Sequence, residues 1–294
     1  MLQIYILTHN RPDLLVYSID SILKQVVKNC QYELIVSDNS TNEDTEKLIG
    51  NNYALISHLH YRKRSPMTSI EHFNIVLSEI TGDFFMMFHD DDTMFSNMIE
   101  TLYNTISSDE KLLAVGSNAK LVRNGKVLRD YFNKSVDLVI NSVDELILAH
   151  FNYYSAPFPS YIYRNNVAKN IKLDIKKGGK YCDVSFLLDI AAKGPIKIIA
   201  EPLMNYVLHK GQDSASYVAE QQCKMIQYMI KVSSFTKHSS LIMRVRLVNL
   251  YVRVLQSKRP ISCRRWRKIQ GIFFKFSPFT LFPRIVIKRI LKLS

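Results

Sequence analysis

The sequence lacks the signatures of several common protein classes. Its four cysteines, Cys30, Cys182, Cys223 and Cys263, lie far apart, with no C-x-x-C pair and no paired histidines. This spacing argues against a disulfide framework and against a structural zinc site. The chain contains neither a G-x-x-x-x-G-K-[ST] loop nor a G-x-G-x-x-G loop, so nothing supports a nucleoside triphosphatase or a dinucleotide-dependent dehydrogenase.

Targeting and membrane-spanning segments are also missing. The opening MLQIYILTHNRP has no basic region, and its apolar run is too short for a signal peptide. No uncharged apolar stretch approaches the roughly 18 residues that are needed to cross a bilayer. We therefore expect the protein to be made in the cytosol and to stay on that side of the membrane.

Acidic residues are absent from the last quarter of the chain. Residues 221–294 contain 17 Lys or Arg and no Asp or Glu, whereas residues 1–220 contain 22 basic and 26 acidic side chains. The formal charge of +13 thus combines a net charge of −4 over residues 1–220 with a strongly basic tail. Because 47% of the 294 residues are hydrophobic, the chain can bury a substantial core. We predict a globular domain over 1–220 and a basic helical segment over 221–294.

Apolar strands and amphipathic helices alternate in the first 90 residues. Three apolar runs are typical of buried parallel strands: 2–9, 32–40 and 83–89. Three segments with apolar residues at helical spacing predict helices: 11–25, 42–50 and 68–82. Pro12 suits the start of the first helix, and Gly82 suits the end of the third. The alternation predicts an α/β fold, a doubly wound and mainly parallel sheet with helices on both faces.

Polar residues stand at the end of each predicted strand, where such sheets bind their ligands. They are Thr8 to Arg11, Asp38 to Ser40, and Asp90 to Asp92. We therefore expect these three groups to converge on one site.

The middle of the chain, roughly 112–180, is less regular. Residues 112–131 suggest strands with a hairpin turn at Asn124–Gly125. The tyrosine- and proline-rich segment 149–164 is typical of irregular structure that lines a cleft. Further on, 183–194 predicts a helix closed by Gly194, and 195–211 predicts a strand and a turn.

The acidic run Asp90–Asp92 follows an apolar strand directly. Three consecutive carboxylates repel one another and gain nothing from packing. A divalent cation with oxygen ligands, Mg²⁺ or Mn²⁺ bridging a diphosphate, would remove that penalty. The alternative is an ordinary acidic loop in which Asp92 caps the next helix, and Asp38 has the same alternative. The buried strand before Asp90 favours the metal site.

In order along the chain, these segments resemble glycosyltransferase family 2, whose members have the GT-A fold. ILTHNRPDLLVYSIDSILKQ is similar to the family's opening strand and helix. ELIVSDNST resembles its nucleotide-binding strand, usually written with a second Asp where this chain has Asn39. Asn74 and Gly82 resemble the Asn-and-Gly pair ahead of the aspartate strand, and HDDDT resembles the D-x-D element.

The later part of the resemblance reaches to about residue 215. YCDVSFLLDIAAKG is similar to the family's E-D segment, with Asp183 eleven residues before Gly194. Cys182 stands in place of the Glu of that segment, which is a departure from the family pattern. NYVLHKGQDS resembles the late Y-x-x-H element through Tyr206 and His209.

The resemblance implies roles for ten residues. It implies donor-binding side chains at Thr8, Asn10, Arg11, Asp38, Asn74 and Asp90, with Asp38 at the base of the nucleotide. It implies metal contacts at Asp91, Asp92 and His209, with the register inside Asp90–Asp92 open by one residue. It implies that Asp183 is the general base. Taken without the family, the residues favour a different interpretation: Asp183 as an N-terminal helix cap, and His209 as a surface or hydrogen-bonded histidine.

The resemblance thus implies an inverting transferase that needs Mn²⁺ or Mg²⁺ and moves a sugar from a nucleotide-sugar to an acceptor hydroxyl. UDP is the default nucleotide, and dTDP is open. The acceptor would be a lipid-linked or other oligosaccharide in O-antigen or capsule synthesis. The nucleotide-binding half would be about 1–110 and the acceptor half about 111–220. Two alternatives are a sugar nucleotidyltransferase, although THNRP has no glycine, and a non-catalytic subunit of the same fold.

The basic tail has its own interpretation. Residues 258–294 mix Lys and Arg with apolar and aromatic side chains, including the lone Trp266. This composition fits a segment that lies on anionic lipid at the inner face of a bacterial cell membrane. The alternative is a solvated charged face that packs on the catalytic domain. A nucleic-acid partner is not expected, because no binding fold is recognisable and the first 220 residues are slightly acidic.

Overall fold

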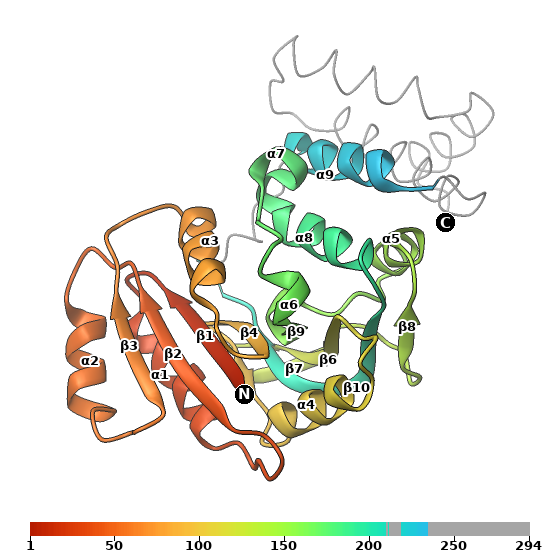
Figure 1. Ribbon diagram of the computed structural model, residues 1–294. Coiled ribbons are helices and arrows are strands. Elements are labelled where there is room, and N and C mark those ends of the chain that lie inside the picture. Colours follow the sequence, from red (N-terminus) through yellow and green to blue (C-terminus); the bar gives the residue numbers. More distant parts are fainter. Residues whose placement is uncertain (210, 212–218, 235–294) are drawn as a thin grey trace. The chain divides into compact units, whose positions relative to one another are not determined.

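The computed structural model of the protein describes residues 1–209, 211 and 219–234. Contacts divide the chain into two compact units. In its described part, the first contains residues 1–142, 154–173, 189–209 and 211. The second contains 143–153, 174–188 and 219–234. All ten strands belong to the first unit and form one sheet (Figure 1).

The first half of the sheet is parallel, as the sequence predicts. Its elements follow in chain order: β1 (Leu2–Thr8), α1 (Pro12–Leu23), β2 (Tyr32–Asp38), α2 (Asp44–Asn52), β3 (Leu59–Lys63), α3 (Ser69–Glu79) and β4 (Phe84–His89). The strand order β3-β2-β1-β4 places later strands on both sides of β1. The chain therefore reverses its direction of winding at β1, which is where such sheets bind ligands.

Two details of this half differ from the sequence prediction. The predicted strand at 83–89 is the fourth strand, because β3 was missed. β3 is short, lies at the edge of the sheet and has only one buried side chain, Leu59, so it shows no apolar run. The helix α3 ends at Glu79, and Ile80 is already extended, so Gly82 does not end it. A Cβ at Gly82 would lie 3.0 Å from the Met1 carbonyl oxygen, so this glycine instead permits a close backbone approach.

The second half of the sheet is mixed. Its elements are β5 (Thr93–Met94), α4 (Met98–Ser108), β6 (Ala114–Arg123), β7 (Lys126–Asp130), β8 (Leu138–Ile140), η1 (Phe158–Ser160), β9 (Ile162–Arg164), α6 (Asn165–Ala168) and β10 (Ile196–Val207). From β4 the order continues β9-β6-β10-β5, with β7 paired to β6 and β8 to β10. β10 runs parallel to β6, and β9 runs antiparallel to both β4 and β6.

The predicted hairpin is confirmed, and the segment that was expected to be irregular is irregular only in part, over residues 152–157. Asn124 (φ 51°) and Gly125 (φ 74°) join β6 to β7, with the positive φ angles that a tight hairpin turn needs. The stretch 149–164, expected to be irregular, contains η1 and ends in β9. β9 has only three residues, too few for a strand pattern to show in the sequence.

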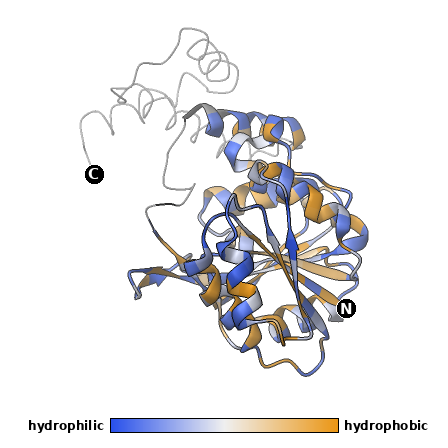
Figure 2. Cartoon of the chain, turned by 90° about the vertical axis from the view of Figure 1, so that its left-hand side faces the viewer, coloured by the Kyte–Doolittle hydropathy of each residue, from blue (hydrophilic) through white to orange (hydrophobic). Residues whose placement is uncertain are grey.

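Helices cover both faces of the sheet. The core of one face joins Leu2, Ile4 and Ile6 of β1 to apolar side chains of α1, α2 and α4. On the opposite face, Ser37 of β2 hydrogen-bonds His72 of α3. Orange, hydrophobic segments lie in the middle of the sheet, and the helices show both hydrophobic and hydrophilic residues (Figure 2). The α/β fold with a mostly parallel sheet is therefore as predicted.

The second unit is helical in its described part. It contains α5 (Val143–Phe151), α7 (Ile175–Gly178), η2 (Gly179–Tyr181), most of α8 (Cys182–Ala191) and α9 (Ala219–Val232). The helix predicted near 183–194 is thus present. Among the described residues, no helix is long and apolar enough to cross a membrane. α9 runs across the boundary expected at residue 220, and the tail from 235 onward lies outside the described residues. The division into 1–220 and 221–294 remains a prediction.

Candidate active site

The three polar groups at strand ends meet in the first unit, as the sequence predicts. Thr8, the last residue of β1, is paired in register with Asp38, the last residue of β2. On the other side of β1, Leu7 is paired with His89, the last residue of β4. The acidic run therefore begins one residue beyond the same edge of the sheet that carries Asp38.

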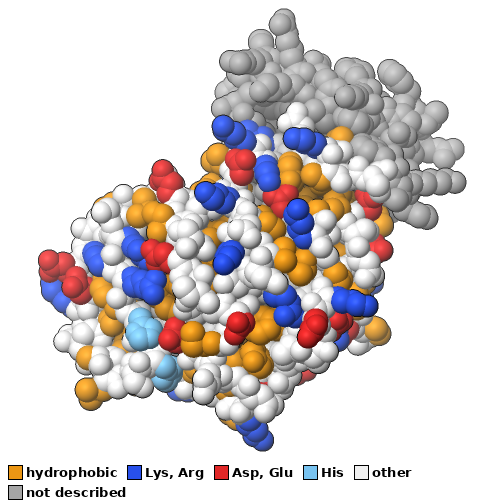
Figure 3. Space-filling view, in the orientation of Figure 1, with side chains coloured by type: hydrophobic (Ala, Val, Ile, Leu, Met, Phe, Trp, Pro, Cys, Tyr) orange, Lys and Arg blue, Asp and Glu red, His pale blue; other side chains and the backbone are white. Residues whose placement is uncertain are grey.

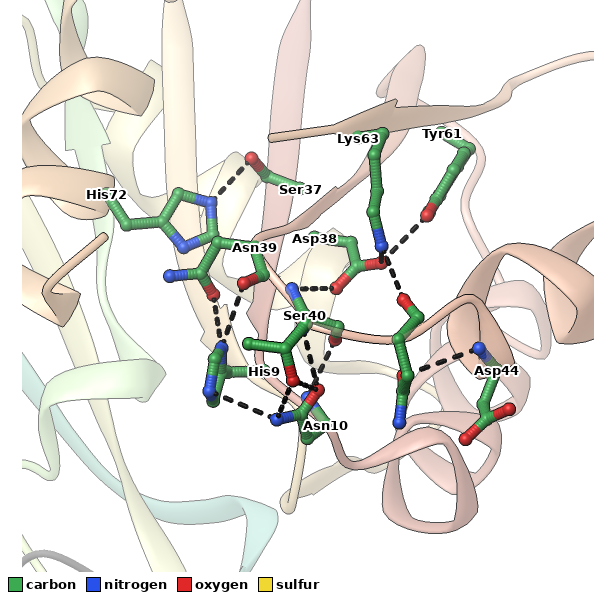
Figure 4. Close-up of polar contacts among 12 residues, drawn as sticks. His9, Asn10, Ser37, Asp38, Asn39, Ser40, Asp44, Tyr61, Lys63 and His72 are labelled. Atoms are coloured by element: carbon green, nitrogen blue, oxygen red, sulfur yellow. Dashed lines mark hydrogen bonds and ion pairs between the residues drawn. The ribbon is translucent and has the colours of Figure 1, made fainter. Parts of the chain in front are cut away.

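Asp38 is fully buried and held by three hydrogen bonds (Figure 4). Its Oδ1 accepts the Ser40 amide at 2.8 Å, and its Oδ2 accepts the Tyr61 hydroxyl at 2.7 Å and Lys63 Nζ at 3.1 Å. Burial alone would raise the pKa of this carboxyl, but hydrogen bonds outweigh burial and lower the pKa below its usual value. Asp38 is therefore a fixed carboxylate. It does not cap α2, which begins at Asp44 without a side-chain cap.

The sequence missed Tyr61 and Lys63, because both lie on the unpredicted strand β3. Tyr61 also faces the carboxylate's charge, so burial and the hydrogen bond to Asp38 raise its pKa well above the usual value. Lys63 Nζ donates a second hydrogen bond, at 2.7 Å, to the Asn42 carbonyl. The only signal for either residue was its position between two predicted elements.

Asn10 links the loop after β1 to the loop after β2. It has a left-handed backbone (φ 54°), and its amide nitrogen donates to Ser40 Oγ at 2.7 Å. Its side chain bonds Thr41 in both directions, with Nδ2 donating to Oγ1 at 3.0 Å and Oδ1 accepting the backbone amide at 2.9 Å. Next to it, His9 Nδ1 lies 2.9 Å from the Asn39 carbonyl oxygen (Figure 4). Asn10 therefore fixes the shape of this rim.

Asn74 contacts the protein backbone. Its Nδ2 donates to the Leu173 carbonyl at 3.0 Å, and its Oδ1 accepts the Leu173 amide at 2.9 Å. The amide group that the resemblance gives to donor binding thus holds a loop in place. Its donor contact stays a prediction.

The acidic run is arranged around Arg11 and His209. Arg11 Nη2 lies 2.7 Å from Asp90 Oδ1, and Nη1 lies 3.4 Å from Asp91 Oδ2. His209 Nε2 lies 2.8 Å from the same Asp91 oxygen. The Val207 amide of β10 donates to Asp92 Oδ1 at 2.8 Å. The structure therefore brings together all the residues that the resemblance assigns to metal, with His209 delivered by the end of β10.

Burial leaves parts of this cluster without hydrogen bonds. Asp90 and Asp92 are both 0% exposed, and Oδ2 of each accepts no hydrogen bond, whereas Oδ1 of Asp90 is ion-paired with Arg11. Burial raises the pKa of Asp90 to about 6 despite the charge of Arg11. Burial and the charge of Asp91 raise the pKa of Asp92 well above its usual value. Asp92 does not cap the next helix, because α4 begins at Met98 after Asn97.

A metal ion fits this arrangement. His89, Asp91 and Asp92 each offer a ligand atom, and these atoms lie within 4.8 Å of one another. A cation would satisfy the carboxylate oxygens that lack hydrogen bonds. The sequence missed His89 as a ligand, although it stands directly before the acidic run. The described residues could therefore hold a metal through His89 as well as through the two aspartates.

Asp183 belongs to the second unit. It lies in the first turn of α8 and is partly exposed, but its Oδ1 is shielded from solvent and accepts no hydrogen bond. Burial raises the pKa of Asp183 to about 6, and nearby backbone amides oppose the shift. The neighbouring Cys182 is a buried free thiol whose pKa burial raises to about 11. Asp183 is therefore a carboxyl with a pKa close to neutral pH.

The chain is similar to known proteins in sequence and in structure. The family described as Glycosyl transferase family 2 matches residues 3–156. S. aureus TarS 1–349 in complex with UDP-GlcNAc aligns with 98% of this chain and 84% of its own, at 16% identity and a TM-score of 0.67. The mannosyltransferase PcManGT from Pyrobaculum calidifontis, in complex with GDP-Man and Mn²⁺, aligns with 100% of this chain and 88% of its own, at 11% identity and a TM-score of 0.60. No curated protein sequence matches. At these identities the solved structures share the fold.

Proposed function

The chain belongs to glycosyl transferase family 2, and from this premise we propose that it transfers a sugar from a UDP-sugar to an acceptor hydroxyl with inversion at the anomeric carbon. One observation carries the proposal. A fixed carboxylate, Asp38, ends β2, and a buried acidic cluster, Asp90–Asp92, follows β4, at the same edge of the sheet on either side of β1. A nucleotide-sugar has a base with an N–H group that can donate a hydrogen bond and a diphosphate whose charge a cation can neutralise. Asp38 suits the base, and the acidic cluster suits the cation.

Asp38 is proposed to accept a hydrogen bond from the base. Its lowered pKa keeps it ionised at neutral pH, so it remains an acceptor. Thr8, Asn10 and Arg11 are proposed to bind the donor beside Asp38, with Asn10 holding two loops in register. Solved relatives of the fold support a nucleotide-sugar, since they were crystallised with UDP-GlcNAc, UDP or GDP-Man.

His89, Asp91 and Asp92 are proposed to hold Mn²⁺ or Mg²⁺, with His209 against Asp91. A bound divalent cation would neutralise the charge that develops on the leaving diphosphate. The protein's own part is to hold these side chains in place. The Val207 amide orients Asp92, and Arg11 balances the charge of Asp90 and Asp91. Asp90 is proposed to lie beside the donor.

Asp183 is proposed to take the proton from the acceptor hydroxyl. A base with a pKa of about 6 is mostly ionised at neutral pH and still basic enough to accept a proton. General-base catalysis of this kind contributes roughly 10²–10⁴ to a rate. The second substrate is proposed to be a lipid-linked or other oligosaccharide of O-antigen or capsule synthesis. The basic tail would bring the enzyme to the inner face of the cell membrane.

A donor-hydrolysis screen tests the proposal. The protein is incubated with UDP-, dTDP- and GDP-sugars, with Mn²⁺ or with EDTA, and release of the nucleoside diphosphate is measured. We expect release from one UDP-sugar with Mn²⁺ and none with EDTA. Pyrophosphate formation from UTP and a sugar phosphate would instead indicate a nucleotidyltransferase. Absence of both binding and hydrolysis across the panel would indicate a non-catalytic protein.

A further inference from the structure

The turn between β6 and β7 carries an exposed surface that the proposed reaction does not use. We define the hairpin tip as residues 123–129, with the sequence RNGKVLR. All seven residues are exposed. Two of them are aliphatic, with Val127 60% and Leu128 52% exposed. The hairpin tip thus presents apolar side chains to solvent at the end of the β6–β7 hairpin.

The geometry of the hairpin keeps these side chains in the open. Among the described strands β7 pairs with β6 alone, and Lys126 to Arg129 are exposed although successive side chains point to opposite faces. In an ordinary outer strand one face would be buried on the core. The pairing places Val127 opposite Val122 and Arg129 opposite Leu121, so Leu128 is the extra residue of a bulge. The turn at Asn124–Gly125 holds the tip in this shape.

The charge of the hairpin tip has one sign. Arg123, Lys126 and Arg129 form no ion pair with any described residue, because Asp130, the nearest acid in sequence, pairs with Lys120 at 2.6 Å. This local excess stands out, since residues 1–220 have a net charge of −4. On the face shown in Figure 3, by contrast, Lys and Arg lie among Asp and Glu side chains.

We propose that the hairpin tip is a membrane-contact element that docks on an anionic lipid bilayer. The surface of such a bilayer has a layer of charged phosphates above a layer of apolar acyl chains. The three cations of the hairpin tip suit the first layer, and its two aliphatic side chains suit the second. The guanidinium and ammonium groups would reach the lipid phosphates, and Val127 and Leu128 would enter the acyl boundary. A nucleic acid would satisfy the cations but would leave both aliphatic side chains in water, so a bilayer is the better match. The element lies in the described first unit and is separate from the basic tail.

The size of the effect follows from the charges. Each Lys or Arg near an anionic surface contributes roughly fivefold to partitioning. We therefore expect neutralising all three with glutamine to weaken binding of the full chain to phosphatidylglycerol vesicles by up to about 100-fold at low salt. Salt should reduce the difference, because it screens exposed charges.

Fluorescence quenching tests contact directly. Leu128→Trp is placed in the full chain together with Trp266→Phe, which removes the natural tryptophan. Leu55→Trp in the same background is the matched control, because Leu55 is a leucine on another loop that is even more exposed, at 97% against 52% for Leu128. With vesicles that contain phosphatidylglycerol and brominated lipid, we expect Leu128→Trp emission to be quenched and Leu55→Trp emission to be unaffected.

Other outcomes would overturn the proposal. Equal quenching of the two variants, or no quenching of Leu128→Trp while the chain sediments with vesicles, would show that the hairpin tip stays in water and that another segment binds. Quenching that is as strong with uncharged phosphatidylcholine vesicles would refute the role of the cations. Donor hydrolysis by both variants, measured in parallel, checks that they fold and keeps this question separate from the proposed reaction.

Discussion

Asp91→Asn is the most informative change at the candidate active site. Both His209 and Arg11 contact Asp91, which belongs to the group of three described residues that could hold a metal. The amide keeps the shape of the side chain but removes its charge. Since loss of a group that only orients a metal ligand costs 10–100-fold in affinity, we expect loss of a ligand to cost about 100-fold or more.

The effect can be read as thermal stability. Ligands at 100 times their Kd stabilise a protein by about 2.7 kcal/mol. A 100-fold weaker variant at the same concentration gains only about 0.4 kcal/mol. At roughly 2–4 °C per kcal/mol for a chain of about this size, Mn²⁺ with UDP would raise the Tm of the wild type by about 5–10 °C. It would raise that of the variant by no more than about 2 °C.

The unliganded variant should not be less stable by a comparable amount. The charge of Asp91 helps to raise the pKa of Asp92, after burial, so removing it relieves repulsion. Two charges about 5 Å apart interact by roughly 3 kcal/mol at an effective dielectric constant of 20. The lost contacts to His209 and Arg11 offset part of this gain. We therefore expect the Tm without ligand to stay the same or to rise slightly.

Calorimetric titration of UDP with and without Mn²⁺, beside thermal unfolding, measures both quantities. Glu110→Gln is the control, because Glu110 is an exposed acid outside the site. If Asp91→Asn bound UDP with the same Mn²⁺ dependence as the wild type, the assignment of the metal to this cluster would be wrong. If it simply unfolded, the same experiment on Asp92→Asn would still test the assignment.

Further predictions concern other parts of the chain. Asp183→Asn should keep donor affinity but lose at least tenfold in kcat, and the rise of wild-type kcat/KM through about pH 6 should disappear; an unchanged pH profile would exclude this residue as the base. Tyr61→Phe should lower the urea-measured stability by about 1.5–3 kcal/mol at pH 7, because Asp38 loses a charged hydrogen bond. Burial, and after it the charge of Arg64, lowers the pKa of His72 from 6.5 to about 4. Below pH 6.5 the unfolded chain therefore binds a proton at His72 that the folded protein does not, and the free energy of unfolding falls. Between pH 7 and pH 5 the free energy of unfolding of His72→Gln should therefore fall by about 2 kcal/mol less than that of the wild type. An equal fall in the two proteins would contradict this prediction. Truncation after Lys258 should reduce binding to anionic vesicles while soluble acceptors are still glycosylated, whereas an insoluble product would favour a tail that packs on the catalytic domain.

The parallel half of the fold was predictable because its signals are local. Each of β1, β2 and β4 is mostly apolar and is followed by, or ends in, polar residues. Adjacent parallel strands share one carboxyl edge, so the predicted strands alone place Asp38 near Asp90–Asp92. The same reasoning could not find β3 or β9, because an exposed edge strand and a three-residue strand lack a hydrophobic pattern.

Partners of the site residues were harder to predict than the residues themselves. Tyr61 and Lys63 meet Asp38 only because β3 pairs with β2, and that pairing has no sequence signature. For Asn74 the opposite holds, because the motif identified the residue but not its partner. In the structure its side-chain amide hydrogen-bonds the backbone of Leu173. A motif thus identifies a position, whereas the contact it makes depends on the segment that packs beside it.

The buried acidic cluster shows how fold and function oppose each other at this site. Asp90 and Asp92 are fully buried, and Oδ2 of each accepts no hydrogen bond, an arrangement that costs stability in the free protein. The neighbouring strands β1 and β4 have no comparable desolvation cost, because most of their buried side chains are apolar. Burial strengthens the attraction of the same oxygens for a cation, because less water competes for them. The cost in the free protein and the affinity for the ion therefore have one cause, and substitutions that stabilise the free protein here should weaken metal binding.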